Sequence, residues 1–420
     1  MITRIRAENF RCLRSVDVAL RPFQILVGPN GSGKSALMDV LAFLGTFVAE
    51  NLDAAIAQRT TNFHDLVWGR EGNRLRLAVE ALVPAMELSR VGDEGWVPIE
   101  PPPQAAVRVT GGEVIEREGR VVIETLPRRK ICYDVEVFAD SQSHTITISE
   151  EALTVEMPGS AVPVRLARRG LKGAEFKAER GTAHASVAVM SQKYSVVANY
   201  PLDLADSPSV FWLRSLLAGD ICCILLEPEK LRAPSPPFRG KPMILTGSHL
   251  APFVAELQDK FPDQFEDWVK HLRTCVPGLE SVRTVLRPED RHRYLMVRYK
   301  NGIEAPSWVV SDGTLRLMAL TVLAYLPTEG RIYVVEEPEN GVHPTAIEAI
   351  YQSFTSVYDG QVLMASHSPI LLNLARPEDL LCFSNTDEGT EIISGDQHPV
   401  LKEWKGEVAL SDLFAGGVLS

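Results

Sequence analysis

Residues 28 to 35 read Gly-Pro-Asn-Gly-Ser-Gly-Lys-Ser and have the spacing of a phosphate-binding loop. Its glycines let successive backbone N–H groups face one anion, and a helix that starts near Lys34 adds its positive end. Lys34 would reach the β- and γ-phosphates of a nucleotide, and the Ser35 hydroxyl would ligate Mg²⁺. The residues predicted to contact a nucleotide here are Asn30, Gly31, Ser32, Gly33, Lys34 and Ser35.

Clustered carboxylates follow a second apolar run, at Glu336-Glu337-Pro338-Glu339. At the carboxyl end of a strand beside a phosphate loop, one carboxylate can hold hydrated Mg²⁺ and the next can polarise an attacking water. Buried strands seldom end in several acids without a nearby cation. The alternative is a solvated, charge-rich turn.

A histidine follows a third apolar run, which spans residues 361 to 365. His367 could hydrogen-bond the γ-phosphate and sense its loss. A lone histidine is often structural, which is the alternative. The position of His367 thirty residues after Glu337, on what we expect to be the next strand, favours the functional interpretation.

The segment Ser311-Asp312-Gly313-Thr314 opens a predicted helix over residues 315 to 326. Ser311 is a good N-cap, and Gly313 allows a phosphate to approach the helix start closely. This helix start is therefore a second candidate anion-binding end in the chain. The alternative is an ordinary capped helix.

Hydrophobic spacing predicts the elements that position these residues. Residues 23 to 27 predict a strand directly before the loop, and residues 34 to 50 predict a helix with one apolar side. Residues 2 to 27 alternate as two strands around a turn at 9 to 12. From 74 to 200, short runs broken by turn signals such as Pro101-Pro102-Pro103 and Gly111-Gly112 predict an antiparallel sheet, with two of its short strands at 145 to 148 and 153 to 156.

Residues 208 to 285 predict mostly helix. This segment includes a Pro-rich loop at 234 to 242 and helices at 250 to 260 and 265 to 275. Strands are expected again at 281 to 286 and 294 to 300.

Length and composition indicate a globular chain of two or three subdomains, with 420 residues of which 45% are hydrophobic. The net charge of -11 makes whole-molecule attraction to nucleic acid weak. Six cysteines without C-x-x-C spacing indicate buried, reduced thiols. The apolar stretch at 317 to 326 is too short to span a bilayer, and the N-terminus lacks a signal-peptide pattern, so we expect a cytoplasmic protein without a membrane partner.

Together the four motifs resemble those of the ATP-binding-cassette (ABC) type ATPase head of RecF, structural-maintenance-of-chromosomes (SMC) proteins and the OLD family. The S-D-G-T signature and the run E-E-P-E-N-G-x-H-P carry this resemblance. It implies an α/β fold: an ABC-type P-loop NTPase head with a long β-rich and helical insertion between the Walker A loop and the signature. It also implies ATP and Mg²⁺ as cofactors, and a homodimer or higher oligomer with ATP sandwiched between heads.

The resemblance assigns a role to each matched residue. Ser311, Asp312, Gly313 and Thr314 would contact ATP bound to the partner subunit. Glu337 would be the catalytic base, His367 the switch histidine, and residues 340 to 343 the D-loop. Lys34 belongs to the same catalytic set, Ser35 and Glu336 would be the Mg²⁺ ligands, and Arg11 resembles a residue that touches the phosphates.

Two departures from the family pattern are visible. The Mg²⁺-side position is usually Asp, and Glu336 is one methylene longer. The Q-loop glutamine has no clear match, with Gln58 and His64 as weak candidates. The domain division that we expect has an N-terminal lobe with Walker A (1–85), a β-rich insertion (86–205), a helical lid (206–285) and a C-terminal lobe with signature, Walker B and switch histidine (286–420).

The biological role is open between two hypotheses. In the first, ATP-driven dimer closure acts in a DNA-linked or phage-defence system, or as a RecF-like repair clamp. In the second, the ATP-bound dimer is a regulatory scaffold that sequesters or triggers a separate effector, a nuclease or toxin, without contacting DNA. We find no nuclease-type acidic pair after His367 and expect any nuclease activity to come from a separate protein. A transporter ATPase is a third, weaker alternative, because its insertion is normally shorter.

Two basic clusters are the candidate nucleic-acid contacts, with solvated hairpins as the alternative. Their members are Arg128, Arg129, Lys130, Arg165, Arg168, Arg169, Lys172, Lys177 and Arg180.

Overall fold

The computed structural model describes most of the 420 residues. The described ranges are 1–91, 97–98, 115–117, 121–140, 142–143, 145–159, 162–170, 173–203, 206–237, 243–327, 330–404, 406 and 408–419. The turn signals at 101 to 103 and 111 to 112, Lys172, and residues 238 to 242 of the predicted Pro-rich loop lie outside them.

Two compact units divide the chain. Unit 1 comprises Met1–Leu20 and Phe43–Ala218, and unit 2 comprises Arg21–Ala42 and Gly219–Ser420. The boundary near residue 42 falls inside helix α1 (Lys34–Ala49), the helix predicted after the phosphate loop. The division into four segments given above stays a prediction.

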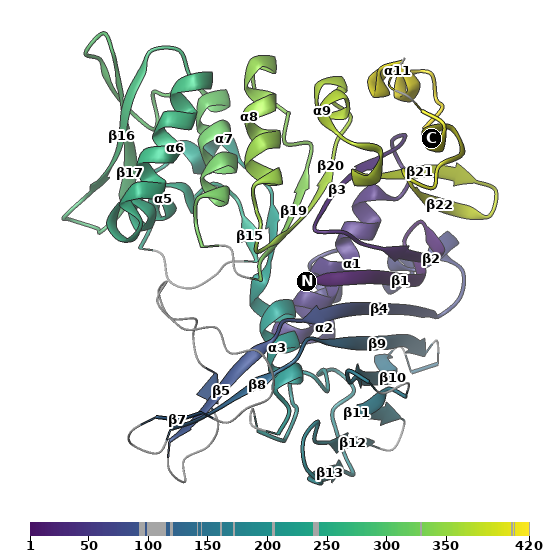
Figure 1. Cartoon of the computed structure of the whole chain (residues 1–420). Helices are drawn as coiled ribbons and strands as arrows, with labels where there is room; N and C mark the ends of the chain where they lie inside the picture. Colours follow the sequence, from purple (N-terminus) through teal and green to yellow (C-terminus); the bar gives the residue numbers. More distant parts are fainter. Residues whose placement is uncertain are drawn as a thin grey trace. The chain divides into compact units, whose positions relative to one another are not determined.

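Unit 1 is built on an eight-stranded antiparallel sheet with the order β13-β12-β11-β10-β9-β4-β1-β2 (Figure 1). Alternate residues of β9, such as Ile131 and Val135, are fully buried, whereas their neighbours are half-buried, as a strand with one face on a core requires. The antiparallel sheet predicted for this part of the chain is therefore confirmed. Its strands are β1 (Ile2–Phe10), β2 (Leu13–Ala19), β4 (Arg74–Val83), β9 (Arg129–Asp140), β10 (Thr145–Glu156), β11 (Val164–Gly170), β12 (Gly173–Lys177) and β13 (His184–Val187).

A small four-stranded sheet and several short helices complete unit 1. The sheet has the order β6-β5-β8-β7. The elements are β5 (Met86–Val91), β6 (Val97–Pro98), β7 (Ile115–Arg117), β8 (Val121–Leu126), α2 (Leu52–Ala57), 3₁₀ turns at Phe63–Leu66 and Trp68–Arg70, and α3 (Pro208–Ser215). A π-helical turn, Leu216–Asp220, follows α3.

Strand β10 corrects one expectation about this unit. Its polar centre, Ser149 to Glu151, divides the apolar pattern and predicts two short strands, but the backbone runs through as one strand with a bulge opposite β9. Glu151 is tolerated inside the sheet because Arg169 donates to it at 3.0 Å and Tyr133 at 2.6 Å. A buried carboxylate with these partners interrupts the sequence pattern without ending the strand.

Unit 2 is built on a seven-stranded sheet with the order β15-β14-β19-β20-β3-β21-β22. The first six strands are parallel, and only β22 pairs antiparallel. Ile332 to Val335 of β19 are all buried, as expected of a central strand covered on both faces. The strands are β3 (Phe23–Val27), β14 (Ile221–Ile224), β15 (Ile244–Leu245), β19 (Ile332–Glu336), β20 (Gln361–Ala365), β21 (Leu380–Thr386) and β22 (Gly389–Ser394).

Two strand assignments differ from expectation. The segment from 208 to 285 is mostly helical, as predicted, but β14 and β15 also lie in it and add two strands to the sheet of unit 2. A four-residue apolar run such as Ile221–Ile224 has no period that separates a buried strand from a buried helix. Residues 2 to 27 form three strands rather than two, and the third, β3, belongs to unit 2.

Helices and a second small sheet surround the parallel sheet. The antiparallel strands β16 (Leu279–Leu286), β17 (Arg293–Tyr299) and β18 (Glu304–Pro306) pair in that order. Helix α5 packs on α6, and α8 packs on both α6 and α7, so these helices stand side by side (Figure 1). The helices are α4 (Pro228–Arg232), α5 (Leu250–Lys260), α6 (Pro262–Cys275), α7 (Asp312–Thr321), α8 (Pro344–Thr355), α9 (Pro369–Leu374), α10 (Pro399–Lys402) and α11 (Leu410–Ala415), with 3₁₀ turns at Val322–Ala324 and Pro377–Asp379.

The six cysteines are all present as thiols. Cys222 and Cys382 are buried, and the other four are partly buried. Burial raises the pKa of the Cys382 thiol to about 12, which keeps it protonated and unreactive. Within the described residues, no helix is both long enough and apolar enough to cross a membrane.

Candidate functional site

Three loops of unit 2 meet at the carboxyl ends of neighbouring parallel strands. Strand β20 lies between β3 and β19, with Ala365 paired to Leu26 on one side and to Glu336 on the other. The phosphate loop follows β3, the carboxylates follow β19, and His367 follows β20. Because parallel strands end at the same edge, the sheet brings together three of the four predicted motifs.

The phosphate loop has the backbone that its glycines were expected to provide. Gly28, Gly31 and Gly33 have φ values of 150°, 78° and 102°, which L side chains rarely adopt. Gly28 is also packed closely, because a Cβ built there would lie 2.3 Å from the carbonyl oxygen of Phe383. A Cβ on Gly31 would meet nothing within 4 Å. The first glycine is thus required by packing and backbone, and the second by backbone alone.

Lys34 is held inside the loop. Its Nζ donates hydrogen bonds to the carbonyl oxygens of Gly28 and Pro29, both at 2.8 Å, and the residue is buried. Burial lowers the pKa of Lys34, while the carboxylates of Glu337 and Glu336 act in the opposite direction. The predicted loop cation and the predicted Walker B acids are therefore close enough to interact electrostatically.

The remaining loop residues differ in exposure. Asn30, Gly31 and Ser35 are exposed, whereas Ser32 is buried. Within the described residues, the Ser32 hydroxyl oxygen has no hydrogen-bond partner. An exposed hydroxyl on Ser35, at the start of α1, is available to a ligand, as the metal-binding prediction requires.

Glu337 sits on a strained backbone directly after β19. Its φ is 46°, in the left-handed region that a non-glycine residue seldom occupies. Its N–H donates to the carbonyl oxygen of Ala365 at 2.8 Å, and the Asn340 side chain donates to its carboxylate. The conformation and the two contacts fix where this carboxylate points, which is what a catalytic base needs.

Glu339 is the residue of this site that sequence reasoning left without a role. One of its carboxylate oxygens accepts from the Ser366 hydroxyl at 2.7 Å and from the backbone N–H of His367 at 3.1 Å. It therefore ties the loop after β19 to the loop after β20 and holds His367. The available signal was its place as the third acid of the E-E-P-E run.

His367 itself is partly buried, and its ring lies 6.1 Å from that of Phe414 on α11. Ser368 follows it as the N-cap of α9. The histidine is thus fixed through its backbone by Glu339 and through the next residue by a helix start.

The S-D-G-T segment forms the start of α7 as predicted. Ser311 caps the helix, with its hydroxyl accepting from the N–H of Thr314 at 3.3 Å, and it is exposed. Asp312 pairs with Arg232 at 2.6 Å. A Cβ on Gly313 would lie 2.8 Å from the carbonyl oxygen of Gly341, so this glycine lets the helix start pack against the predicted D-loop.

Arg11 and the two Q-loop candidates lie in unit 1. Arg11 has a φ of 54° in the turn between β1 and β2, and its N–H donates to the carbonyl oxygen of Leu66. Gln58 accepts a hydrogen bond from the Thr46 hydroxyl at 3.1 Å, and His64 lies in a 3₁₀ turn. The assignment of Arg11 to the nucleotide phosphates stays a prediction.

The predicted basic clusters are divided by the fold. Arg129 and Arg169 are buried in ion pairs with Glu179 and Glu151, so neither is a surface cation. Lys130 pairs with Glu80 at 2.7 Å. Three other members, with one histidine, line a cavity of about 440 Å³ on β11, β12 and β13; they are Arg165, Arg168, Lys177 and His184.

The donor set at the sheet edge fits a nucleotide and a hydrated divalent cation. Gly31 leaves open space at the loop, Ser32 has a buried hydroxyl oxygen without a hydrogen-bond partner among the described residues, and Lys34 supplies a cation. Ser35 and Glu336 are exposed oxygen donors, and Mg²⁺ typically takes only one or two protein ligands beside phosphate oxygens and water.

Two family models match the chain in separate segments. Residues 1–83 match a model described as "AAA ATPase domain", and residues 246–373 match one described as "AAA domain, putative AbiEii toxin, Type IV TA system". The first segment contains the phosphate loop, and the second contains the S-D-G-T segment, Glu336, Glu337 and His367.

Among curated proteins, the chain is similar over short segments to two kinds of relative. It is 45% identical over 38 residues to an OLD nuclease of Thermus scotoductus, covering 9% of this chain and 7% of that protein. It is 44% identical over 45 residues to the DNA replication and repair protein RecF of Erwinia tasmaniensis, covering 10% and 12%. The matched segments thus span only a small part of either relative's length.

Among solved structures, the fold matches an SMC head. The crystal structure of the SmcHead bound to the C-winged helix domain of ScpA aligns with a TM-score of 0.50 and 12% identity, covering 93% of this chain and 97% of that one. This match confirms the predicted ABC-type P-loop fold. The motifs, the two ATPase family models and this fold together support an ABC-type ATPase similar to RecF, SMC and OLD proteins.

Proposed function

We propose that this chain binds and hydrolyses ATP with Mg²⁺ and switches by ATP-dependent dimerisation of its heads. The main support is that the phosphate loop, the acids Glu336 and Glu337, and His367 follow the neighbouring parallel strands β3, β19 and β20 at one edge of the sheet. A buried cation beside two acids and a glycine loop is the arrangement that phosphoryl transfer needs for positioning and charge stabilisation.

The site residues of unit 2 have separate roles in the proposed hydrolysis of ATP. When bound, Mg²⁺ neutralises charge on the phosphates, and Ser35 and Glu336 would hold it. Lys34 exchanges its hydrogen bonds with Gly28 and Pro29 for phosphate oxygens. Glu337 orients the attacking water and accepts its proton, and His367 donates a hydrogen bond toward the γ-phosphate.

Support for a two-head site comes from the S-D-G-T segment. Ser311 is exposed, and in the part of the chain that the structure describes, the side-chain hydrogen bonds and ion pairs of Ser311, Asp312 and Thr314 run to one another and to Arg232. This helix start is therefore available to a phosphate presented by a second copy. The known pairing of family heads through ATP is the analogy on which the dimer rests.

The test is Glu337→Gln in the full chain. The amide cannot accept the water's proton, whereas Lys34 still binds phosphate, so ATP binding should persist, turnover should fall at least a hundredfold, and the ATP-bound dimer should accumulate. Glu348→Gln makes the same charge change at an exposed site on α8 and should behave like the wild type. Turnover near the wild-type rate, or no increase of dimer in light scattering with ATP, would exclude Glu337 as the base.

A DNA-linked or phage-defence role extends this proposal to nucleic acid. The cavity of about 440 Å³ on β11 to β13 gathers Arg165, Arg168, Lys177 and His184 against one acid, Glu175. Such a local patch is what a chain of net charge -11 would need in order to bind phosphates. The names of the RecF and OLD relatives point the same way.

Fluorescence anisotropy with a 30-base-pair DNA duplex distinguishes a DNA-binding role from that of a scaffold that does not contact DNA. Replacing Arg165, Arg168 and Lys177 with alanine should weaken binding and reduce its salt dependence by about three charges. A matched set in unit 2, Lys230, Lys270 and Arg283 to alanine, should not. If the wild type binds no DNA at low salt, that result supports the alternative role of a scaffold that controls a separate nuclease or toxin. The toxin–antitoxin name of one family model suggests such a role.

A further inference from the structure

A second cavity lies in unit 2, on the opposite end of β19 from the phosphate loop. It has a volume of about 670 Å³, within the usual range for small-molecule sites. Arg331, which lines it, directly precedes β19, whereas Glu337 directly follows that strand. At roughly 3.3 Å per residue, the six intervening steps separate the two positions by about 20 Å. The cavity is therefore distinct from the candidate ATP site.

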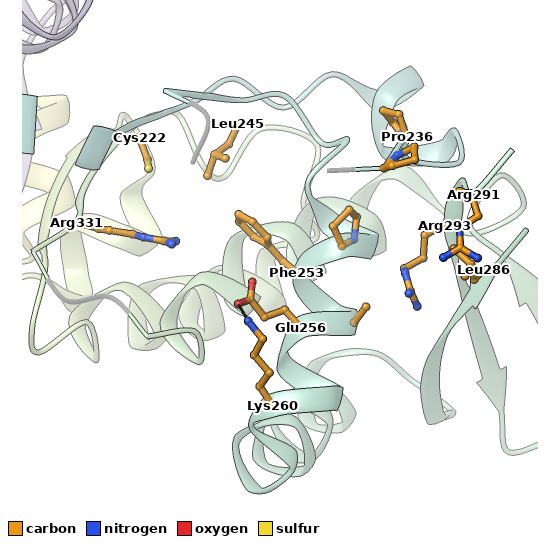
Figure 2. Close-up of a pocket in the computed structure, with 13 residues that line it drawn as sticks. Cys222, Pro236, Leu245, Phe253, Glu256, Lys260, Leu286, Arg291, Arg293 and Arg331 are labelled. Atoms are coloured by element: carbon orange, nitrogen blue, oxygen red, sulfur yellow. Dashed lines mark hydrogen bonds and ion pairs between the residues drawn. The ribbon is translucent and has the colours of Figure 1, made fainter. Parts of the chain in front are cut away.

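The residues that line this cavity come from separate elements, two of which are joined by backbone hydrogen bonds. Phe253, Glu256 and Lys260 project from α5, while Arg291 and Arg293 come from the β16–β17 hairpin (Figure 2). Ser235 exchanges backbone hydrogen bonds of 2.7 and 2.8 Å with Arg293. These bonds hold the prolines that follow Ser235, which also line the cavity, against β17.

Positive charge collects in this cavity although the chain as a whole is acidic. Four cations line it and one acid, Glu256, which is already paired with Lys260 at 2.9 Å. Arg293 donates to a neutral acceptor, the Thr284 hydroxyl, at 2.9 Å. Over the residues that the structure describes, Arg291, Arg293 and Arg331 form no ion pair with a carboxylate. The arginine charges are therefore not neutralised within this part of the chain.

The hairpin turn presents one of these arginines on a strained backbone. Arg291 has a φ of 62°, a conformation that glycine would adopt more readily. The neighbouring Asp290 is occupied by Arg287 at 3.2 Å and by the N–H of His292 at 3.0 Å. An arginine kept where glycine would fit better, and beside an acid that pairs elsewhere, is an unusual choice for a purely structural turn.

The arginines lie at two ends of the cavity, with apolar groups between them. Figure 2 shows Arg331 on one side, Arg291 and Arg293 on the other, and Phe253 between them. Guanidinium groups match phosphate oxygens in a bidentate manner, and an aromatic ring with prolines suits a flat or apolar moiety. We propose that this cavity binds a small phosphorylated organic molecule, with its phosphate on Arg291 and Arg293 and its apolar part against Phe253.

Calorimetry with 1-naphthyl phosphate tests this on the full chain. The phosphate loop is removed as a source of binding in two ways: by saturating wild type with a non-hydrolysable ATP analogue and Mg²⁺, and by Lys34→Ala without nucleotide. Both forms should bind one equivalent of the probe with the same affinity, because the cavity lies at the other end of the sheet. 1-Naphthol, which lacks the phosphate, should bind at least tenfold more weakly.

The variants separate the cavity from general charge. Arg291→Gly removes the cation and relieves the backbone, so it should fold at least as well as the wild type yet bind the probe about tenfold or more weakly. Arg293→Gln should weaken binding similarly. Arg287→Ala changes the charge of the same turn outside the cavity lining and should bind within twofold of the wild type.

Several outcomes would overturn the proposal. These are no saturable binding up to several millimolar, equal affinity for the wild type and Arg291→Gly, or equal loss with Arg287→Ala. If an acidic aromatic peptide such as acetyl-Glu-Phe-Glu-amide binds at this site and 1-naphthyl phosphate does not, the occupant is a peptide and the proposal is wrong.

Discussion

Two glycines of the phosphate loop give a matched pair of substitutions whose costs can be worked out from the structure. Gly28→Ala places a Cβ 2.3 Å from the carbonyl oxygen and 2.8 Å from the Cβ of Phe383, on the neighbouring strand β21. Gly31→Ala places it in open space. Both have positive φ, 150° and 78°, so both incur a backbone cost of about 1 to 2 kcal/mol.

The difference between the two lies in packing. Phe383 is fully buried in the paired strands β21 and β3, so its backbone cannot move away cheaply. Overpacking of this kind adds about 1 to 3 kcal/mol. We therefore expect Gly28→Ala to lower the free energy of unfolding by about 2 to 5 kcal/mol, and Gly31→Ala by about 1 to 2 kcal/mol.

Urea unfolding without nucleotide, followed by tryptophan fluorescence, measures the difference. Nucleotide is left out because a ligand that binds only the folded state would mask it. Gly28→Ala should also weaken ATP binding, since the displaced loop no longer aims its N–H groups at one anion. Equal unfolding midpoints for the two variants would refute the close packing of Gly28 on β21.

Two further predictions concern buried or partly buried polar groups of unit 2. Glu339→Ala removes the acceptor that holds Ser366 and His367, so it should lower the free energy of unfolding by about 2 to 4 kcal/mol and reduce turnover more than ATP affinity. Glu339→Gln keeps an acceptor oxygen and should retain more stability in urea unfolding and more turnover than Glu339→Ala. Equal turnover in the wild type and both variants would contradict the role of Glu339 in holding His367. Burial lowers the pKa of His249 to about 3, below its unfolded value near 6.5, so as the pH falls the unfolded state binds the extra proton first. The free energy of unfolding should be unaffected above about pH 7 and should fall by about 2 kcal/mol by pH 5. His249→Gln should lose this pH-dependent decrease when urea unfolding is measured at the two pH values.

The parts of the site with strong local signals were predictable from the sequence. The loop from 28 to 35 requires glycines at set positions, and β3 and α1 flank it as their apolar spacing predicts. Ser311 as an N-cap and the acids at the end of β19 likewise follow from local chemistry. Such features depend on a few neighbouring residues, so no tertiary information is needed to see them.

Other parts depend on contacts between distant segments. Nothing near Ile221–Ile224 reveals that it pairs in parallel with β19, about a hundred residues later. The role of Glu339 depends on the loop after β20, and the buried state of Arg169 depends on Glu151. The interacting residue lies on another element in all three examples. A charged residue is therefore predicted to be solvent-exposed unless its buried partner is known.

Mixing two inactive variants tests whether ATP is hydrolysed between two heads. Ser311→Arg keeps a sound phosphate loop but blocks the signature, whereas Lys34→Ala keeps a sound signature but loses the loop cation. Each alone should be inactive, and mixing should restore turnover, because one heterodimer interface combines the intact loop with the intact signature. Ser311→Asp, which preserves the cap of α7, controls for loss of the helix start.

Circular dichroism and subunit exchange of labelled chains should first establish that both variants are folded and mix. Turnover should then rise on mixing to about one working site in each heterodimer. Turnover that stays at the level of the separate variants would contradict hydrolysis between two heads and leave an ATP site that works within a single chain.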